Sequence, residues 1–194
     1  MDRRQLMRLM TGISLGSILL PAIGYPQQTL PQPSMVHLPP GAGDTVKIGD
    51  MGITFKLSGK QTLGQMGAWE TVLQPGELGA PPHYHAKTDE ICRVLEGTVT
   101  IMTGDIVTQV QAGGWHLRPR NQVHTFWNSG SSVARTIDLC LPARHADYMR
   151  ALARLFEHGH KPTSADLKNL EKKYDIVYRF DLLETISQKY GVKL

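Results

Sequence analysis

Cysteine is scarce in this chain of 194 residues, and its two cysteines, Cys92 and Cys140, both lie within apolar runs. One pair cannot form the disulfide scaffold typical of small secreted domains. No Cys-x-x-Cys pair is present, which argues against a zinc site built from thiolates. We therefore expect two buried free thiols. Hydrophobic residues make up 41% of the chain, and this content excludes a disordered or collagen-like protein.

A strong excess of one charge is also missing from most of the chain. The formal net charge is +4, but three arginines and one aspartate near the start supply half of it. The remainder is nearly balanced, so the basic isoelectric point is weak support for nucleic-acid binding. We expect no nucleic-acid partner.

Residues 1–24 have the charge order of an export signal. A basic start is followed by an apolar run over residues 10–20, then by Pro21 and small residues up to Gly24. The run is shorter than the roughly 20 apolar residues that a membrane-spanning helix needs. The pair Arg3-Arg4 resembles a twin-arginine signal, although an uncleaved anchor and an ordinary secretory signal remain alternatives. We expect a cleaved signal and an exported, periplasmic protein without membrane attachment.

The rest of the chain divides into three parts by composition. Residues 25–44 contain five prolines and predict an extended linker. Residues 45–142 contain short β-like runs separated mostly by Gly or Pro turns, a pattern typical of an antiparallel sandwich or barrel. The runs lie at residues 53–57, 68–73, 90–95, 98–102, 106–111, 115–118, 123–128 and 133–141.

In residues 143–194 the hydrophobic pattern becomes helical. One helix is expected over residues 145–158, a second beginning at a cap on Thr163 or Ser164, and a third over residues 180–190. We expect these helices to pack on the outside of the β domain.

Three residues in one short stretch have side chains suited to binding a metal. His83 and His85 are two apart, so on an extended segment both imidazoles point to the same face. Glu90 follows five residues later at the start of an apolar strand. Two neutral imidazoles and one carboxylate suit a divalent transition metal. A His-x-His pair alone, however, is common on protein surfaces.

A fourth candidate ligand, His124, lies 34 residues beyond Glu90. It follows a turn at Pro119 and begins a predicted strand, where a ligand facing a barrel interior could lie. Asn121 in this turn tolerates the left-handed backbone conformation that glycine often adopts. Taken alone, His124 is equally compatible with an ordinary strand histidine.

Together the two stretches resemble the two sequence motifs of the cupin superfamily, in the right order and spacing. The first motif is matched by His83, His85, Glu90 and Gly97, although the glycine that precedes its histidines has no counterpart here. The second is matched by Gly113, Pro119, His124 and Asn128, with Asn121 in place of the middle glycine.

This resemblance implies an all-β fold, a cupin jelly-roll β-barrel over about residues 45–142 with the C-terminal α-helices of residues 143–194 appended. It also implies a single divalent metal bound by His83, His85, Glu90 and His124. The metal could be Fe, Mn, Ni, Co, Cu or Zn, because the same nitrogen and oxygen ligands accept all of these.

The layout also looks like that of the single-domain cupins called quercetin 2,3-dioxygenase-like. This second resemblance implies a dioxygenase acting on a small phenolic or enol substrate, with Glu90 as a catalytic residue that is either a fixed ligand or a proton acceptor. A cupin isomerase or decarboxylase and a non-enzymatic binder of a small molecule or metal are the alternatives, since one fold hosts many chemistries. A homodimer is a further expectation.

Other polar residues are interpreted more simply. The second His-x-His pair, His158 and His160, is predicted to lie at a solvated helix end. Arg118 and Arg120 flank Pro119 and could contact an anionic substrate, but we expect them to be exposed turn residues.

Overall fold

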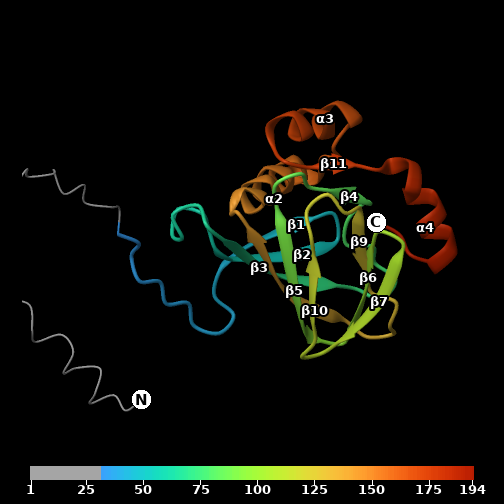
Figure 1. Cartoon of the computed structure of the whole chain (residues 1–194), viewed down its shortest axis with the longest axis horizontal. Coiled ribbons are helices and arrows are strands. Elements are labelled where there is room, and N and C mark those ends of the chain that lie inside the picture. The colour runs from blue at the N-terminus through green and yellow to red at the C-terminus, as the bar shows by residue number, and fades with distance from the viewer. Residues whose placement is uncertain (1–31) are drawn as a thin grey trace, which may run out of the picture. The chain divides into compact units, whose positions relative to one another are not determined.

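The computed structural model describes residues 32–194, shown in colour in Figure 1. The predicted export signal of residues 1–24 lies outside these described residues. Within them, two antiparallel β-sheets are followed by helices at the C-terminal end. This arrangement confirms the predicted all-β class with appended helices.

The larger sheet contains six strands in the order β1-β2-β3-β10-β5-β8. Neighbours in this order are antiparallel, and the non-sequential order brings β10 between β3 and β5. The strands are β1 (Asp44–Ile48), β2 (Met51–Leu57), β3 (Gly67–Leu73), β5 (Asp89–Glu96), β8 (Trp115–Arg118) and β10 (Ala134–Leu141).

The smaller sheet contains five strands in the order β11-β4-β9-β6-β7. Two of them are only two residues long, and β11 comes from the C-terminal part of the chain. The strands are β4 (His83–Tyr84), β6 (Thr98–Thr103), β7 (Ile106–Gln111), β9 (His124–Trp127) and β11 (Val177–Tyr178). Sequence periodicity could not predict β1, β4 or β11, because they are short or border proline-rich segments.

The hydrophobic core includes apolar residues from both sheets. Ile53, Leu73 and Val94 from the larger sheet and Val99 and Ile101 from the smaller one are fully buried in a single cluster. Along most of β2 and β5, alternation buries every second side chain. Both cysteines are free and buried, as expected, and burial raises the pKa of both thiols, that of Cys140 to about 12.

The C-terminal segment, defined here as residues 144–194, contains three α-helices. They are α2 (Arg144–Leu155), α3 (Ser164–Lys173) and α4 (Leu183–Tyr190). A short 3-10 turn, η1 (Glu157–Gly159), follows α2, and another, η2 (Phe180–Leu182), precedes α4. No helix among residues 32–194 has both the length and the hydropathy needed to cross a membrane.

Each α-helix has a clear physical basis. Helix α2 packs its buried face, which includes Tyr148, Met149 and Leu152, on β3 and β10. Thr163, one of the two residues predicted to cap α3, does so in a reciprocal capping box with Asp166. Helix α4 ends at Gly191, whose left-handed backbone conformation ends the helix.

Candidate metal centre

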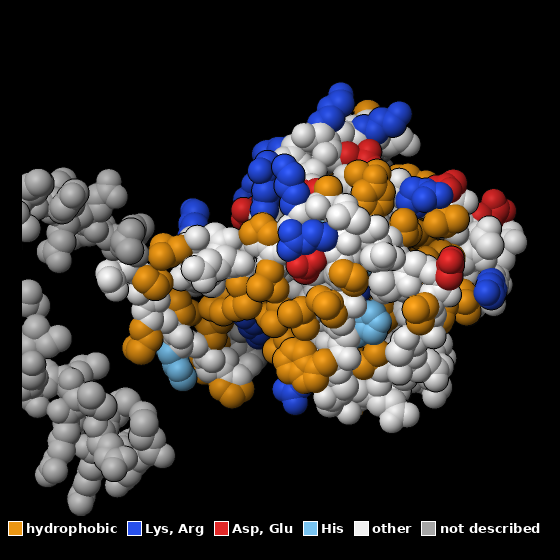
Figure 2. All heavy atoms as spheres, viewed as in Figure 1, with side chains coloured by type: hydrophobic (Ala, Val, Ile, Leu, Met, Phe, Trp, Pro, Cys, Tyr) orange, Lys and Arg blue, Asp and Glu red, His pale blue; other side chains and the backbone are white. Residues whose placement is uncertain are grey.

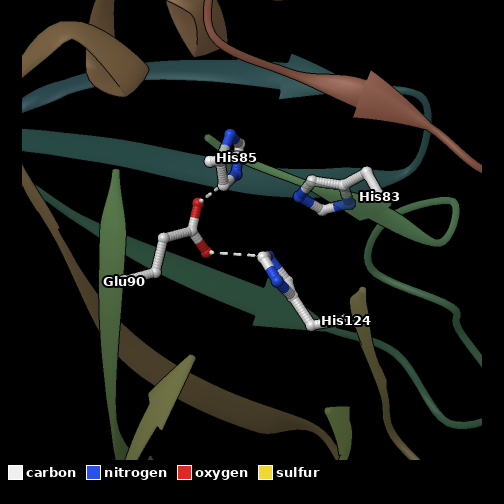
Figure 3. Close-up of side chains that lie close together, drawn as sticks. All are labelled: His83, His85, Glu90 and His124. Atoms are coloured by element: carbon white, nitrogen blue, oxygen red, sulfur yellow. Dashed lines mark ion pairs between the residues drawn. The ribbon is translucent and has the colours of Figure 1, made fainter. Parts of the chain in front are cut away.

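Strands from both sheets and the loop after β4 position the four predicted ligands. His83 lies on β4 and is the register partner of His124 on the neighbouring strand β9. Glu90 lies near the start of β5 in the facing sheet. His85 follows β4, in the loop that leads to β5. All four side chains are buried, and they point toward one another in Figure 3.

The distances within this group are short enough for one metal ion to contact all four residues. One candidate ligand atom from each of the four residues lies within 4.8 Å of all the others. The Nε2 atom of His85 is 3.2 Å from Oε1 of Glu90, and the Nε2 atom of His124 is 3.6 Å from Oε2. The structure therefore brings together two sequence stretches that the motifs had linked only by resemblance.

Backbone carbonyls determine how the three imidazoles are protonated. The Nδ1 atom of His83 lies 2.8 Å from the carbonyl of Pro81, and that of His124 lies 3.0 Å from the carbonyl of Gln122. The Nδ1 atom of His85 pairs with the carbonyl of Asp175. A carbonyl can only accept a hydrogen bond, so each Nδ1 carries the proton. In the neutral imidazole, Nε2 is then left with a lone pair.

These lone pairs make the four residues fit a metal ion. The Nε2 atoms of His85 and His124 are buried without a hydrogen-bond partner among the described residues. Nitrogen lone pairs facing carboxylate oxygens repel one another unless a cation lies between them. Three imidazole nitrogens and one carboxylate oxygen are a donor set that binds divalent transition metals. The site could thus hold one such ion.

At three of the four candidate ligands, the electrostatics favour the protonation state that a metal requires. Burial lowers the pKa of His83 and of His124, which keeps both imidazoles neutral. Burial alone would raise the pKa of Glu90, but Arg118, His145 and His124 together outweigh it and hold that pKa well below its usual value. For His85 the effect of burial is outweighed by Glu90, so its pKa is raised.

Arg118 is the main correction to the sequence analysis. It was predicted to be an exposed turn residue, but its side chain is only 2% exposed, whereas that of Arg120 is 49% exposed. Its Nη2 atom lies 3.2 Å from Glu90 and 2.5 Å from Asp138. Asp138 is held in turn by the hydroxyls of Thr71 and Thr136. Arg118 is the register partner of Glu90, which explains why it points inward.

The C-terminal helices pack on the β domain as expected, but their segment also reaches the candidate ligands, which the sequence did not predict. His145 on α2 is buried, and its Nε2 atom lies 2.9 Å from Oε1 of Glu90. Asp175, between α3 and β11, contacts the loop that carries His85. The helical spacing around His145 marked an inward face, but no sequence pattern linked that face to the metal ligands.

The second His-x-His pair follows the prediction made for it. His158 and His160 lie in and just after η1 and are exposed to solvent. His160 lies 3.7 Å from Asp166, and both side chains are solvent-accessible. Identical spacing therefore gives a buried cluster in one place and a surface pair in the other.

A cavity of about 790 Å³ opens beside the site. It is bordered by His83, Glu90 and His145, and its other walls are mainly apolar. Gly79 in the cavity wall lets the Phe126 ring pack closely against the backbone, because a Cβ atom there would come within 2.2 Å of that ring. The large apolar side chains in the walls include Trp69, Phe126, Met149, Leu152, Phe156 and Ile176.

Comparison with known proteins identifies the fold. Residues 69–140 match a family described as "Cupin domain". KdgF from Halomonas sp. is 16% identical, and the match covers 59% of this chain and 99% of that one with a TM-score of 0.51. At this identity the likeness is one of fold. No curated protein matches the chain in sequence.

Two further solved structures are similar at lower TM-scores. A sugar phosphate isomerase from a cupin superfamily of Silicibacter pomeroyi is 22% identical, with a TM-score of 0.43 over 48% of this chain and 60% of that one, less than two thirds of its length. A predicted oxalate decarboxylase from Thermotoga maritima is 18% identical, with a TM-score of 0.46 over 48% and 82%. The finer resemblance to quercetin 2,3-dioxygenase-like cupins stays a prediction.

Proposed function

Starting from a chain that carries a cupin domain, we propose that it is a metal-dependent enzyme, a dioxygenase acting on a small phenolic or enol substrate. One observation carries the proposal: the buried cluster of three histidines and Glu90 borders a cavity whose walls are mainly apolar. Such a cavity accepts an aromatic or aliphatic body, and its few polar groups orient one polar end of the ligand.

The charges around the cavity favour this substrate class over a phosphorylated sugar. Arg118 borders the cavity next to the ligands, but its charge is already paired with Glu90 and Asp138. The other two cationic residues among the described lining, Lys47 and Lys161, are exposed to solvent. A phosphate group near the ligands would therefore lack a free cationic side chain to pair with.

The proposed reaction assigns different roles to the ligands and to the apolar walls of the cavity. His83, His85, Glu90 and His124 would hold the ion, which would act as a Lewis acid toward a substrate oxygen. The apolar walls exclude water, which strengthens electrostatic interactions inside. Glu90 is either a fixed ligand or, if one oxygen is released, the base that takes the proton from the substrate hydroxyl.

Oxygen uptake tests the proposal. Metal-free protein loaded in turn with Fe, Mn, Ni, Co, Cu or Zn should consume dioxygen in the presence of at least one member of a phenolic and enol panel. A Glu90→Gln variant that is still loaded with metal should lose this uptake. Turnover without oxygen consumption would favour a cupin isomerase or decarboxylase. Ligand binding without turnover would favour a non-enzymatic binder.

We also propose that two copies of the chain pair through the outer face of the larger sheet. Hydrophobic side chains gather in the middle of the face drawn in Figure 2, in front of β5. On β8, Trp115 and Leu117 are 60% and 56% exposed, and Leu117 lies beside Ile91 of β5.

Light scattering should give twice the chain mass for the wild type. Trp115→Glu should halve it, whereas Ile106→Glu, an exposed position on β7, should not.

Export to the periplasm is proposed from the sequence of residues 1–24 alone. N-terminal sequencing of the exported protein should give a mature chain that begins after about Gly24. A mature chain that begins at Met1 would refute cleavage.

A further inference from the structure

The C-terminal segment reaches the metal centre at two places that the family match does not include. The match ends at residue 140, whereas His145 and Asp175 lie beyond it. One of these residues contacts the loop of His85, and the other contacts Glu90. Two of the four candidate ligands are therefore in contact with a part of the chain outside the matched domain.

Asp175 binds the His85 loop with both its carboxylate and its backbone. The backbone N–H groups of Ala86 and Lys87 donate to the two carboxylate oxygens at 2.9 and 2.7 Å, and the hydroxyl of Thr88 donates at 3.1 Å. The carbonyl of the same residue accepts the Nδ1–H of His85. Four hydrogen bonds from one residue thus fix both the path of this loop and the orientation of the imidazole.

His145 holds Glu90 from the side of helix α2. Its Nε2 atom makes the shortest of the four ionic contacts of Glu90, at 2.9 Å from Oε1. Arg118 contacts the other oxygen, Oε2, at 3.2 Å. The two contacts together restrict rotation of the carboxylate plane.

His145 also differs from the three barrel histidines in its surroundings. Each of those has a backbone carbonyl on Nδ1, whereas among the described residues His145 has no such hydrogen bond. Nothing therefore assigns its proton to Nδ1, and Nε2 can carry it and donate to Glu90. His145 thus suits a hydrogen-bond donor to the carboxylate better than a fifth ligand.

We propose that His145 and Asp175 are positioning residues of the metal centre, so that docking of the C-terminal segment and metal binding stabilise each other. This inference rests on the metal site of the proposed function. Partners that orient ligands typically change metal affinity by about 10- to 100-fold when they are removed. An ion that binds only the docked form also favours docking, by linkage.

Titration of the metal-free full chain with Co²⁺ tests the inference. Asp175→Ala and His145→Ala should each weaken Co²⁺ binding by about 10- to 100-fold and alter the visible spectrum of the saturated protein. His145→Gln should recover most of the affinity, because its amide nitrogen can donate from nearly the same place. Asp175→Asn, which keeps one acceptor oxygen, should lie between wild type and Asp175→Ala.

Matched controls come from the same segment. Asp181 is exposed and pairs with Arg179, and His160 is exposed after η1. Asp181→Ala and His160→Ala should keep the affinity and the spectrum of the wild type. Circular dichroism of each metal-free variant selects a temperature at which all are folded.

The outcomes separate this inference from the proposed function. If folded Asp175→Ala and His145→Ala bind Co²⁺ like the wild type with an unchanged spectrum, the two residues are only structural and the inference is wrong. If His145→Gln binds as weakly as His145→Ala, the donor role of His145 is wrong. If the wild type itself binds no Co²⁺, nor any of the other five metals, the proposed function fails and the inference fails with it.

Discussion

The barrel and the C-terminal segment contribute to the same site in different ways. All four candidate ligands come from the barrel strands and the loop between them, within residues 83–124. The C-terminal segment adds Asp175, which hydrogen-bonds to His85 across 90 positions of sequence, and His145, which contacts Glu90. Donor atoms can thus be found in local patterns, whereas the residues that orient them come from contacts between distant parts of the chain.

The largest expected effect comes from removing a barrel ligand. His83→Ala or His124→Ala should remove most of the bound metal and lower the melting temperature of the loaded protein, because a site with three donors loses affinity and the stabilisation that binding provides. Elemental analysis and thermal unfolding measure the two effects.

The second His-x-His pair provides the control for this experiment. His158→Ala and His160→Ala should leave the metal content unchanged, because these side chains are exposed and are not part of the buried cluster. Unchanged metal content in both barrel variants would refute the assignment of the ligands.

The next largest effect is a difference in stability between variants of a buried and of an exposed arginine in the barrel. Arg118→Met should lower the free energy of unfolding by about 3–5 kcal/mol, since it leaves Glu90 and Asp138 buried without their cation. Urea denaturation of the metal-free protein measures this loss. Arg120→Met, which breaks the exposed pair with Asp89, should have little effect. If Arg118→Met and Arg120→Met lowered the free energy of unfolding equally, the buried ion pairs of Arg118 would contribute no more to stability than the exposed pair of Arg120.

The smallest expected effect is on how the stability of the C-terminal segment depends on pH. The hydrogen bonds from Thr163 hold the pKa of Asp166 below its usual value of 3.8. A lowered pKa stabilises the fold above that value, and this contribution is lost as the pH falls below it. Urea midpoints at pH 6 and pH 3 should therefore differ less for Asp166→Asn than for the wild type. An identical pH dependence would show that this cap does not contribute.

Sequence motifs predicted the four candidate ligands that lie together in the structure, but not the residues around them. Glu90 and Cys92 both point inward, as alternation along a strand requires, and the prediction for Asn121 is confirmed by its φ of +63°. Arg118 was missed because its burial depends on the register between β5 and β8, which periodicity does not reveal. His145 was missed because a helical pattern shows that a face is buried without showing what it contacts.

The pairing of Arg118 with two acids has a consequence for the charge of the interior. With neutral imidazoles, Glu90, Asp138 and Arg118 together leave one negative charge below the cavity. A divalent cation among the ligands would reverse the sign and leave one positive charge in surroundings of low polarity. A phenolate or enolate would then bring the interior to neutrality, whereas an uncharged alcohol would not. Arg118 therefore does not bind an anionic substrate itself. It neutralises one of the two buried acids, so that the site with its metal ion carries a net positive charge that attracts an anion.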